Sequence, residues 1–183
     1  MEGYTLDNQV VSSNFVGYDE FGHPRFDTTR SEIGEHLYRL KYGNESAAID
    51  PIVQTVVLFI TSWKIQIDLI IPVPPSNLKR TSQPLLELAR ALSAQMGTPL
   101  CEDCLTKVKE TPQLKNIQDY QARVKLLENA FTVATEKTRG KNVLVFDDLY
   151  QSGATLNEIA KILSGVGLVS NVYVLAVTRA GKV

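Results

Sequence analysis

The chain has 183 residues, of which 44% are hydrophobic and 21% are charged. This is the composition of an ordinary globular protein, and the length is enough for one domain with a sizeable core. The 19 Lys and Arg residues nearly balance the 20 Asp and Glu residues, which leaves a net charge of -1 and no positive field that would gather nucleic acid. We therefore expect no DNA or RNA partner.

The sequence has neither the pattern of an export signal nor that of a membrane span. It begins MEGYTLDNQV, with two acidic residues and no apolar core, and its most apolar segment, residues 49–63, is interrupted by polar side chains. We expect a cytoplasmic protein without membrane contacts. The same apolar segment suits either the core or the contact of a homodimer, which the sequence leaves open.

The only two cysteines, Cys101 and Cys104, have the C-x-x-C spacing of half a zinc site or of a redox pair. The other half of a zinc site is missing, because His23 and His36 lie far upstream in segments of a different pattern. The simpler interpretation is two ordinary cysteines near a strand.

Short elements are expected in the first third of the chain. Residues 1–30 mix glycines, a proline and scattered aromatic residues, which indicates short strands and turns at a lid or sheet edge. A short helix should begin after Ser31 and end at Gly43. A second helix should follow, with Asp50 as its cap and Pro51 in its first turn.

The pattern changes at residues 69–75, LIIPVPP, a continuous apolar run closed by prolines. Such a run is typical of a parallel strand that is covered on both faces. Residues 82–96 have helical spacing, and residues 98–108 can supply another strand. The polar segment 109–121 has few apolar anchors and is the best candidate for a mobile loop.

The last unit has the clearest pattern. Residues 143–146, VLVF, form a buried strand, a helical stripe runs from Leu156 to Leu163, and residues 172–177 form the next strand. This is a βαβ unit, and ligands of such sheets bind outside the carboxyl ends of the strands. We expect an α/β fold, a Rossmann-like parallel sheet flanked by helices. The domain should cover residues 1–183, with a core at 65–180 and an extension or hood at 1–45.

Two acidic residues, Asp147 and Asp148, leave the strand at its carboxyl end. Adjacent carboxylates repel each other and gain nothing from the core, so a solvated turn or a ligand must account for them. A ligand with vicinal hydroxyls, or a cation, would suit their oxygens.

Small residues follow at 152–155, Ser-Gly-Ala-Thr, and lead directly into the helix. Small side chains let backbone N–H groups approach an anion, and the helix N-terminus adds about half a positive charge. Thr155 and Glu158 also fit a capping box, so Thr155 can serve its own helix instead. The loop predicts a phosphate site.

Other phosphate-binding motifs fail on this sequence. A nucleotide-hydrolysing P-loop needs a Lys directly after its last Gly, but Gly153 is followed by Ala154. A dinucleotide-binding fold needs a G-x-G-x-x-G motif, and none follows an expected strand. An aspartyl-phosphate phosphatase would need acids spaced D-x-D. Two carboxylates followed by an anion cradle suit ribose 5-phosphate.

The stretch at residues 143–155, VLVFDDLYQSGAT, resembles the binding motif of type I phosphoribosyltransferases. Four further stretches resemble the ComF-related members: the LKYxN pattern at 40–44, the IIPVPP strand end with Lys79, Arg80 and Gln83, then Arg123, and Ala130-Phe131. The resemblance covers roughly residues 37–180. It departs at Gln151-Ser152, where the family has paired threonines, and the N-terminal zinc ribbon of many ComF proteins is absent.

The resemblance implies a type I phosphoribosyltransferase fold and an enzyme that binds phosphoribosyl pyrophosphate with Mg2+. Such an enzyme transfers phosphoribosyl to a nitrogenous acceptor and releases pyrophosphate. The alternative is a regulatory or competence-related protein that binds the same ligand without turnover. The sequence does not identify the acceptor.

The resemblance also implies roles for particular residues. Asp147 and Asp148 would be the catalytic residues that hold the ribose hydroxyls, with Mg2+ carried mostly by the ligand and by water. The 73–76 loop, in which the family often has a cis peptide, would offer amides to pyrophosphate, and the segment around Lys115 would close over it. The ligand-binding residues expected on this basis are Gln151, Ser152, Gly153, Ala154, Thr155, Val73, Pro74, Pro75, Ser76, Lys79, Arg80, Lys115 and Arg123. For Arg123, a surface charge on a helix is the competing interpretation.

Overall fold

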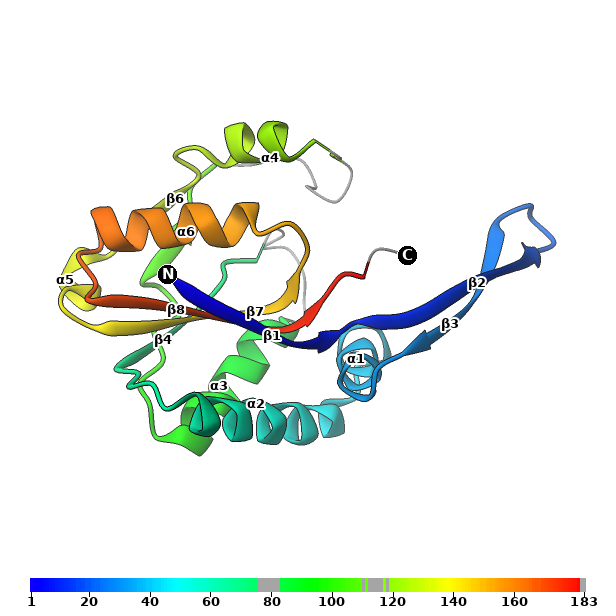
Figure 1. Ribbon diagram of the computed structural model, residues 1–183, viewed down its shortest axis with the longest axis horizontal. Coiled ribbons are helices and arrows are strands. Elements are labelled where there is room, and N and C mark those ends of the chain that lie inside the picture. Colours follow the sequence, from blue (N-terminus) through cyan, green and yellow to red (C-terminus); the bar gives the residue numbers. More distant parts are fainter. Residues whose placement is uncertain (76–82, 110, 112–116, 118, 182–183) are drawn as a thin grey trace.

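A central sheet of four parallel strands organises the chain (Figure 1). The structure is a computed structural model, and it describes residues 1–75, 83–109, 111, 117 and 119–181. The strand order is β1–β8–β7–β4, and every neighbouring pair is parallel. The strands are β1 (Glu2–Asn8), β4 (Leu69–Pro72), β7 (Asn142–Tyr150) and β8 (Asn171–Arg179). The expected parallel sheet is confirmed.

Helices cover both faces of this sheet. The helix α6 (Ala154–Gly165) lies on one face, and α2 (Ile49–Trp63) and α3 (Pro84–Met96) lie on the other (Figure 1). Burial on both sides explains the continuous apolar runs, because alternate side chains of a strand point to opposite faces. Val145 therefore packs in the cluster under α6, while Leu144 and Phe146 pack in the cluster under α2 and α3.

The remaining helices of the described chain are short. They are α1 (Glu32–Tyr38), the π-helical turn Arg39–Gly43, the 3-10 turn Ser46–Ala48, α4 (Tyr120–Leu127) and α5 (Thr135–Thr138). The expected start of α1 is confirmed, because the Ser31 hydroxyl accepts a hydrogen bond from Gly34 N at 3.1 Å. The expected cap of α2 is wrong: Ala48 is its N-cap, and Asp50 lies in the first turn.

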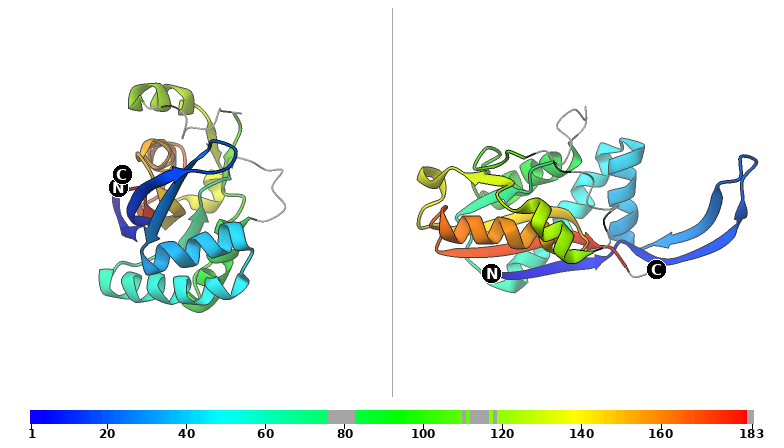
Figure 2. Two further views of the ribbon diagram at one scale, coloured as in Figure 1. Left: turned by 90° about the vertical axis from the view of Figure 1, so that its right-hand side faces the viewer. Right: turned by 90° about the horizontal axis from the view of Figure 1, so that it is seen from above.

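The N-terminal region contributes an edge strand and a projecting hairpin. β1 forms the edge of the central sheet beside β8. The hairpin of β2 (Val10–Tyr18) and β3 (Pro24–Arg30) is antiparallel and extends away from the rest of the molecule (Figures 1 and 2). The sequence predicted short strands at a lid or sheet edge, and β1 is such an edge strand; that its partner is β8 of the central sheet was not predicted.

The strand expected within residues 98–108 does not extend the parallel sheet. Leu100 makes an isolated parallel bridge to Ile70 at the sheet's edge. The strand itself, β5 (Leu105–Lys107), pairs antiparallel with β6 (Phe131–Val133) in a separate ribbon. Apolar content predicted the strand, but a run this short does not specify its partner.

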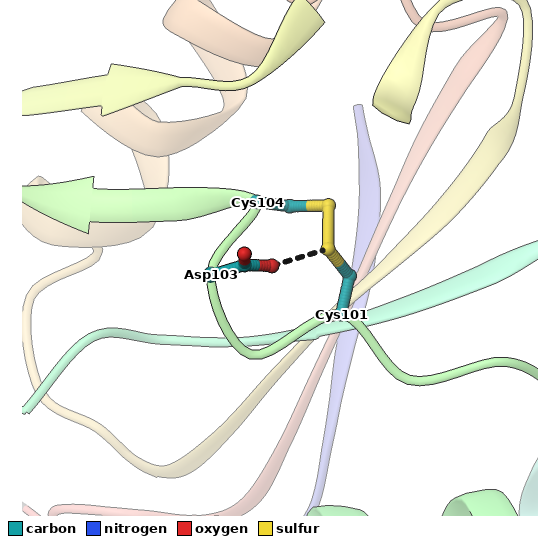
Figure 3. A group of neighbouring side chains, drawn as sticks. All are labelled: Cys101, Asp103 and Cys104. Atoms are coloured by element: carbon teal, nitrogen blue, oxygen red, sulfur yellow. Dashed lines mark hydrogen bonds between the residues drawn. A yellow bond between two sulfur atoms is a disulfide. The ribbon is translucent and has the colours of Figure 1, made fainter. Parts of the chain in front are cut away.

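Cys101 and Cys104 form a disulfide in the turn before β5 (Figure 3). The two cysteines are thus bonded to each other, whereas the simpler interpretation took them as two ordinary cysteines near a strand. The Asp103 carboxylate lies beside the bridge, with its Oδ1 atom 3.3 Å from Cys101 Sγ. Cys101 N donates to Ile70 O at 2.9 Å and Cys104 O accepts from Ala134 N at 2.9 Å, so the bridge joins the sheet edge to the β5–β6 ribbon.

One stretch of the described residues, Ser46–Trp63, is long and apolar enough to span a membrane by length and composition alone. Its buried side chains, Ala48, Ile52, Val53, Val56 and Ile60, belong to the core cluster beneath the sheet. They make up 28% of the stretch, so one face of this helix packs in the core and the rest of it is not buried.

Candidate functional site

The two acidic residues lie where β7 leaves the core. Phe146 is fully buried and pairs with Pro72 at the end of β4, while Asp147 pairs with Ala176 of β8. Asp147 and Asp148 are both half-buried. They therefore stand at the carboxyl end of the sheet, the edge at which ligands of parallel α/β folds bind.

Burial raises the pKa of Asp147 to about 7, and the negative charge of Asp148 contributes to the rise. The Asp148 N–H group opposes this effect by donating to Asp147 Oδ1 at 2.8 Å, and Lys41 opposes it at longer range. Near neutral pH, Asp147 therefore exchanges a proton easily, and its neutral form can donate as well as accept a hydrogen bond.

Asp148 forms an ion pair with a residue far away in the sequence. Lys41 Nζ lies 2.7 Å from Asp148 Oδ2, and the two side chains are only 14% and 21% exposed. The Thr178 hydroxyl fixes the backbone at the same point by donating to Asp148 O at 3.1 Å. The side chain and the backbone of the second acid are thus each held in place by a contact with another part of the chain.

A π-helical turn after α1 supplies Lys41. Leu40 is buried beside it, and Asn44 ends the turn in the left-handed region at φ 58°. Turns of this type change the direction of side chains and are frequent at functional sites. The LKYxN pattern was noted in the sequence, but no role for Lys41 followed from it. The LKYxN pattern is the only feature of the sequence that could have drawn attention to this lysine.

The phosphate loop leads into α6 as the sequence predicted. Gly153 is the N-cap of α6 and adopts φ 76°, a conformation that a side chain would strain. The N–H groups of Ala154, Thr155 and Leu156 make no hydrogen bond to any residue that the structure describes. Three such backbone donors at a helix N-terminus form an arrangement that can accept an anion.

The capping-box alternative for Thr155 is wrong. The N-cap is two residues earlier, so Thr155 lies inside the first turn and makes no side-chain capping bond. The hydroxyls of Ser152 and Thr155 are half-buried, and the Gln151 side chain is exposed. Both hydroxyls remain available to a bound anion.

The loop after β4 differs from its expected role. Val73 N donates to Phe146 O at 2.9 Å and so prolongs the sheet, while Pro74 and Pro75 have no N–H group. These three residues have no amide to offer pyrophosphate, and no cis peptide occurs among the described residues. Ser76, Lys79 and Arg80 lie outside the described residues.

Arg123 is buried at 8% exposure, so the surface-charge interpretation is wrong. Its Nε atom donates to Ile117 O at 2.6 Å and thereby fixes the chain that leads into α4. Lys115, its expected companion in a closing segment, lies outside the described residues.

The acid pair does not fit a directly bound Mg2+ ion. Lys41 already neutralises Asp148, and burial favours the neutral form of Asp147, whereas Mg2+ is bound by ionised carboxylates. The metal expected from the sequence would therefore have to come with the ligand's own phosphate oxygens.

No family model matches the sequence. Among curated proteins, Competence protein F of Haemophilus influenzae is 30% identical over 116 residues, which cover 61% of this chain and 50% of that protein. The chain thus matches half the length of this relative.

Two solved structures share the architecture. Adenine phosphoribosyltransferase from Saccharomyces cerevisiae matches 90% of this chain and 83% of its own at a TM-score of 0.50 and 12% identity. Glutamine phosphoribosylpyrophosphate amidotransferase from B. subtilis matches 86% of this chain and 34% of its own at a TM-score of 0.51 and 18% identity.

The chain has the type I phosphoribosyltransferase fold. The resemblance drawn from residues 143–155 is thereby confirmed, including its ComF-related part. In this fold the end of β7 and the start of α6 bring together the acid pair and the anion cradle that the sequence placed four residues apart.

Proposed function

We propose that the protein binds phosphoribosyl pyrophosphate and transfers its phosphoribosyl group to a nitrogenous acceptor, with release of pyrophosphate. One observation carries this proposal: the acid pair near the carboxyl end of β7 is followed, after residues 149–153, by the first N–H groups of α6, which make no hydrogen bond to a described residue. The acids suit vicinal ribose hydroxyls, and the amides suit the 5-phosphate.

In this reaction the bond between C1 of the ribose and the pyrophosphate oxygen breaks, and pyrophosphate leaves with the electron pair. A bond from C1 to the acceptor nitrogen forms, and the acceptor loses its proton to water. The chain contributes by position and charge. Asp147 and Asp148 hold the hydroxyls, residues 151–155 hold the phosphate, and Mg2+ arrives on the ligand. We place this activity in the cytoplasm.

Pyrophosphate release tests the proposal. The protein is incubated with phosphoribosyl pyrophosphate, Mg2+ and a panel of nucleobases. Release that depends on one base, and falls at least about tenfold in Asp148→Asn, supports transfer, because the variant loses a charged hydrogen-bond acceptor. Asp50→Asn, on an exposed position of α2, is the matched control. Silence across the panel would argue against catalysis.

The alternative is a regulatory or competence-related protein that binds the same ligand without turnover. Two observations favour it: Val73, Pro74 and Pro75 have no free amide for the leaving pyrophosphate, and an exposed Gln151 stands where the family has a hydroxyl. The similarity to Competence protein F is consistent with it. Calorimetry that finds tight binding, together with no pyrophosphate release, would select this alternative.

A further inference from the structure

Lys41 has no role in the proposed reaction so far, although its position is specific. Leu40 is buried on one side of it, and the π-helical turn Arg39–Gly43 ends at Asn44 with a left-handed backbone. A solvated lysine needs no such support. The turn brings the ammonium group to the carboxyl end of β7, where the ligand is expected.

The contact of Lys41 is with the acid pair itself. Its Nζ atom lies 2.7 Å from Asp148 Oδ2, and the ammonium also acts on Asp147 through its charge. At 14% exposure, the lysine is screened far less by salt than a surface lysine would be. One full positive charge is therefore built into the half-buried acid pair.

Two neighbouring carboxylates in a partly buried site need a positive charge to remain ionised. A divalent cation is one source of it, and a fixed ammonium group is another. Because the ammonium is already present, a metal ion bound directly to the pair would have to displace it.

We propose, on the basis of the proposed function, that Lys41 is the resident cation of the ribose subsite, so that ribose 5-phosphate binds there through Lys41 and without Mg2+. The ammonium holds Asp148 as an acceptor for one ribose hydroxyl, and Asp147 serves the neighbouring one. Lys41 is thus a positioning residue, and Mg2+ is needed only by the pyrophosphate part of the larger ligand.

A purely structural role for Lys41, which would tie the turn after α1 to the sheet, makes a different prediction. Loss of a structural tie lowers the melting temperature but leaves the metal dependence of binding unchanged. Loss of a resident cation leaves an uncompensated acid pair, which Mg2+ can then neutralise. Metal dependence of ribose 5-phosphate affinity therefore separates the two roles.

The test is calorimetric titration of the full chain with ribose 5-phosphate, in EDTA and in excess Mg2+. The variants are Lys41→Met, which keeps the stem, Lys41→Arg, which keeps the charge, and Lys64→Met at the exposed end of α2 as the control. Circular dichroism confirms that each variant is folded. We expect the wild type and Lys64→Met to bind equally in both buffers.

Lys41→Met should bind about 10- to 100-fold more weakly in EDTA, the loss typical of one charged hydrogen bond, and regain affinity in Mg2+. Lys41→Arg should retain most of the affinity. Unchanged binding by Lys41→Met, or a wild type that requires Mg2+, would overturn the inference and leave the proposed function standing. No binding of ribose 5-phosphate or phosphoribosyl pyrophosphate to the wild type would overturn both.

Discussion

The side chain of Tyr150 closes over Gly153: a Cβ atom at residue 153 would come within 2.9 Å of the Tyr150 hydroxyl oxygen and 3.1 Å of its ring. The left-handed backbone at φ 76° adds a second reason for glycine. The phosphate loop therefore depends on the absence of a side chain at this residue.

Gly153→Ala should destabilise the protein by about 1–2 kcal/mol, the cost of a left-handed conformation for a residue with a Cβ atom. It should also weaken ribose 5-phosphate binding, because the turn that presents the α6 amides would shift. Thermal unfolding and calorimetry measure the two effects. Gly165→Ala is the control: apart from its own helix backbone and chain neighbours, no atom of the described residues lies within 4 Å of its added Cβ, and it should be neutral or stabilising by up to about 1 kcal/mol. Equal melting temperatures for the two variants would contradict the argument.

The raised pKa of Asp147 gives a prediction for stability against pH. The pKa of this carboxyl rises from its ordinary value of 3.8 to about 7 in the folded protein, so between these values the folded state holds a proton that the unfolded state lacks. Stability is then lost as the pH rises through this window. Asp147→Asn has no such loss, and its stability relative to the wild type should be higher at pH 8 than at pH 5 by about 2–3 kcal/mol. Urea unfolding at the two pH values measures this difference. A difference that does not change with pH would refute the assignment.

The ion pair between Lys41 and Asp148 should appear as coupling in a double-mutant cycle. Lys41→Met and Asp148→Asn should each destabilise the protein by about 1–3 kcal/mol, because each leaves a half-buried charge or acceptor unpaired. The double variant should lose clearly less than the sum, with a coupling of about 1 kcal/mol or more.

Lys161→Met is the control for this cycle. Its side chain is 76% exposed and lies 3.8 Å from Glu158, so its loss should cost less than about 0.5 kcal/mol. Additive effects of Lys41→Met and Asp148→Asn in urea unfolding would show that the pair makes no net contribution.

The disulfide between Cys101 and Cys104 closes a very short loop, with a sequence separation of three. Loop-closure entropy then limits its contribution to about 2 kcal/mol. A reducing agent should lower the melting temperature by about 4–8 °C in a protein of this size. The double variant Cys101→Ala, Cys104→Ala should show no response to the reductant. A wild type that is equally stable with and without reductant would contradict this prediction.

The parts of the fold that sequence predicted are those in which local pattern and final environment agree. Residues 143–146 are apolar throughout because both faces of β7 are buried, so the run itself reveals a central parallel strand. The small residues before α6 likewise predict the anion cradle, since only backbone geometry is needed to make it.

The missed features depend on partners far away in the chain. The LKYxN pattern does not indicate that Lys41 will meet Asp148, and the expected strands at a sheet edge in residues 1–30 do not indicate pairing with β8. The short β5 strand is predicted as a strand, but its pairing with β6 comes from tertiary packing. The prediction that Thr155 caps α6 is wrong for a local reason, because Gly153 is the N-cap and Thr155 lies inside the helix.

The position of β1 also has a consequence for the order in which the fold can form during synthesis. β1 pairs only with β8 in the central sheet, and β8 contains residues 171–179. β1 leaves the ribosome long before β8 and must therefore wait for it before it gains its hydrogen bonds. Contacts between such distant segments are slow to form, and until then the unpaired β1 segment is open to other strands. Chaperone dependence during translation is thus expected to fall when residues 1–8 are deleted.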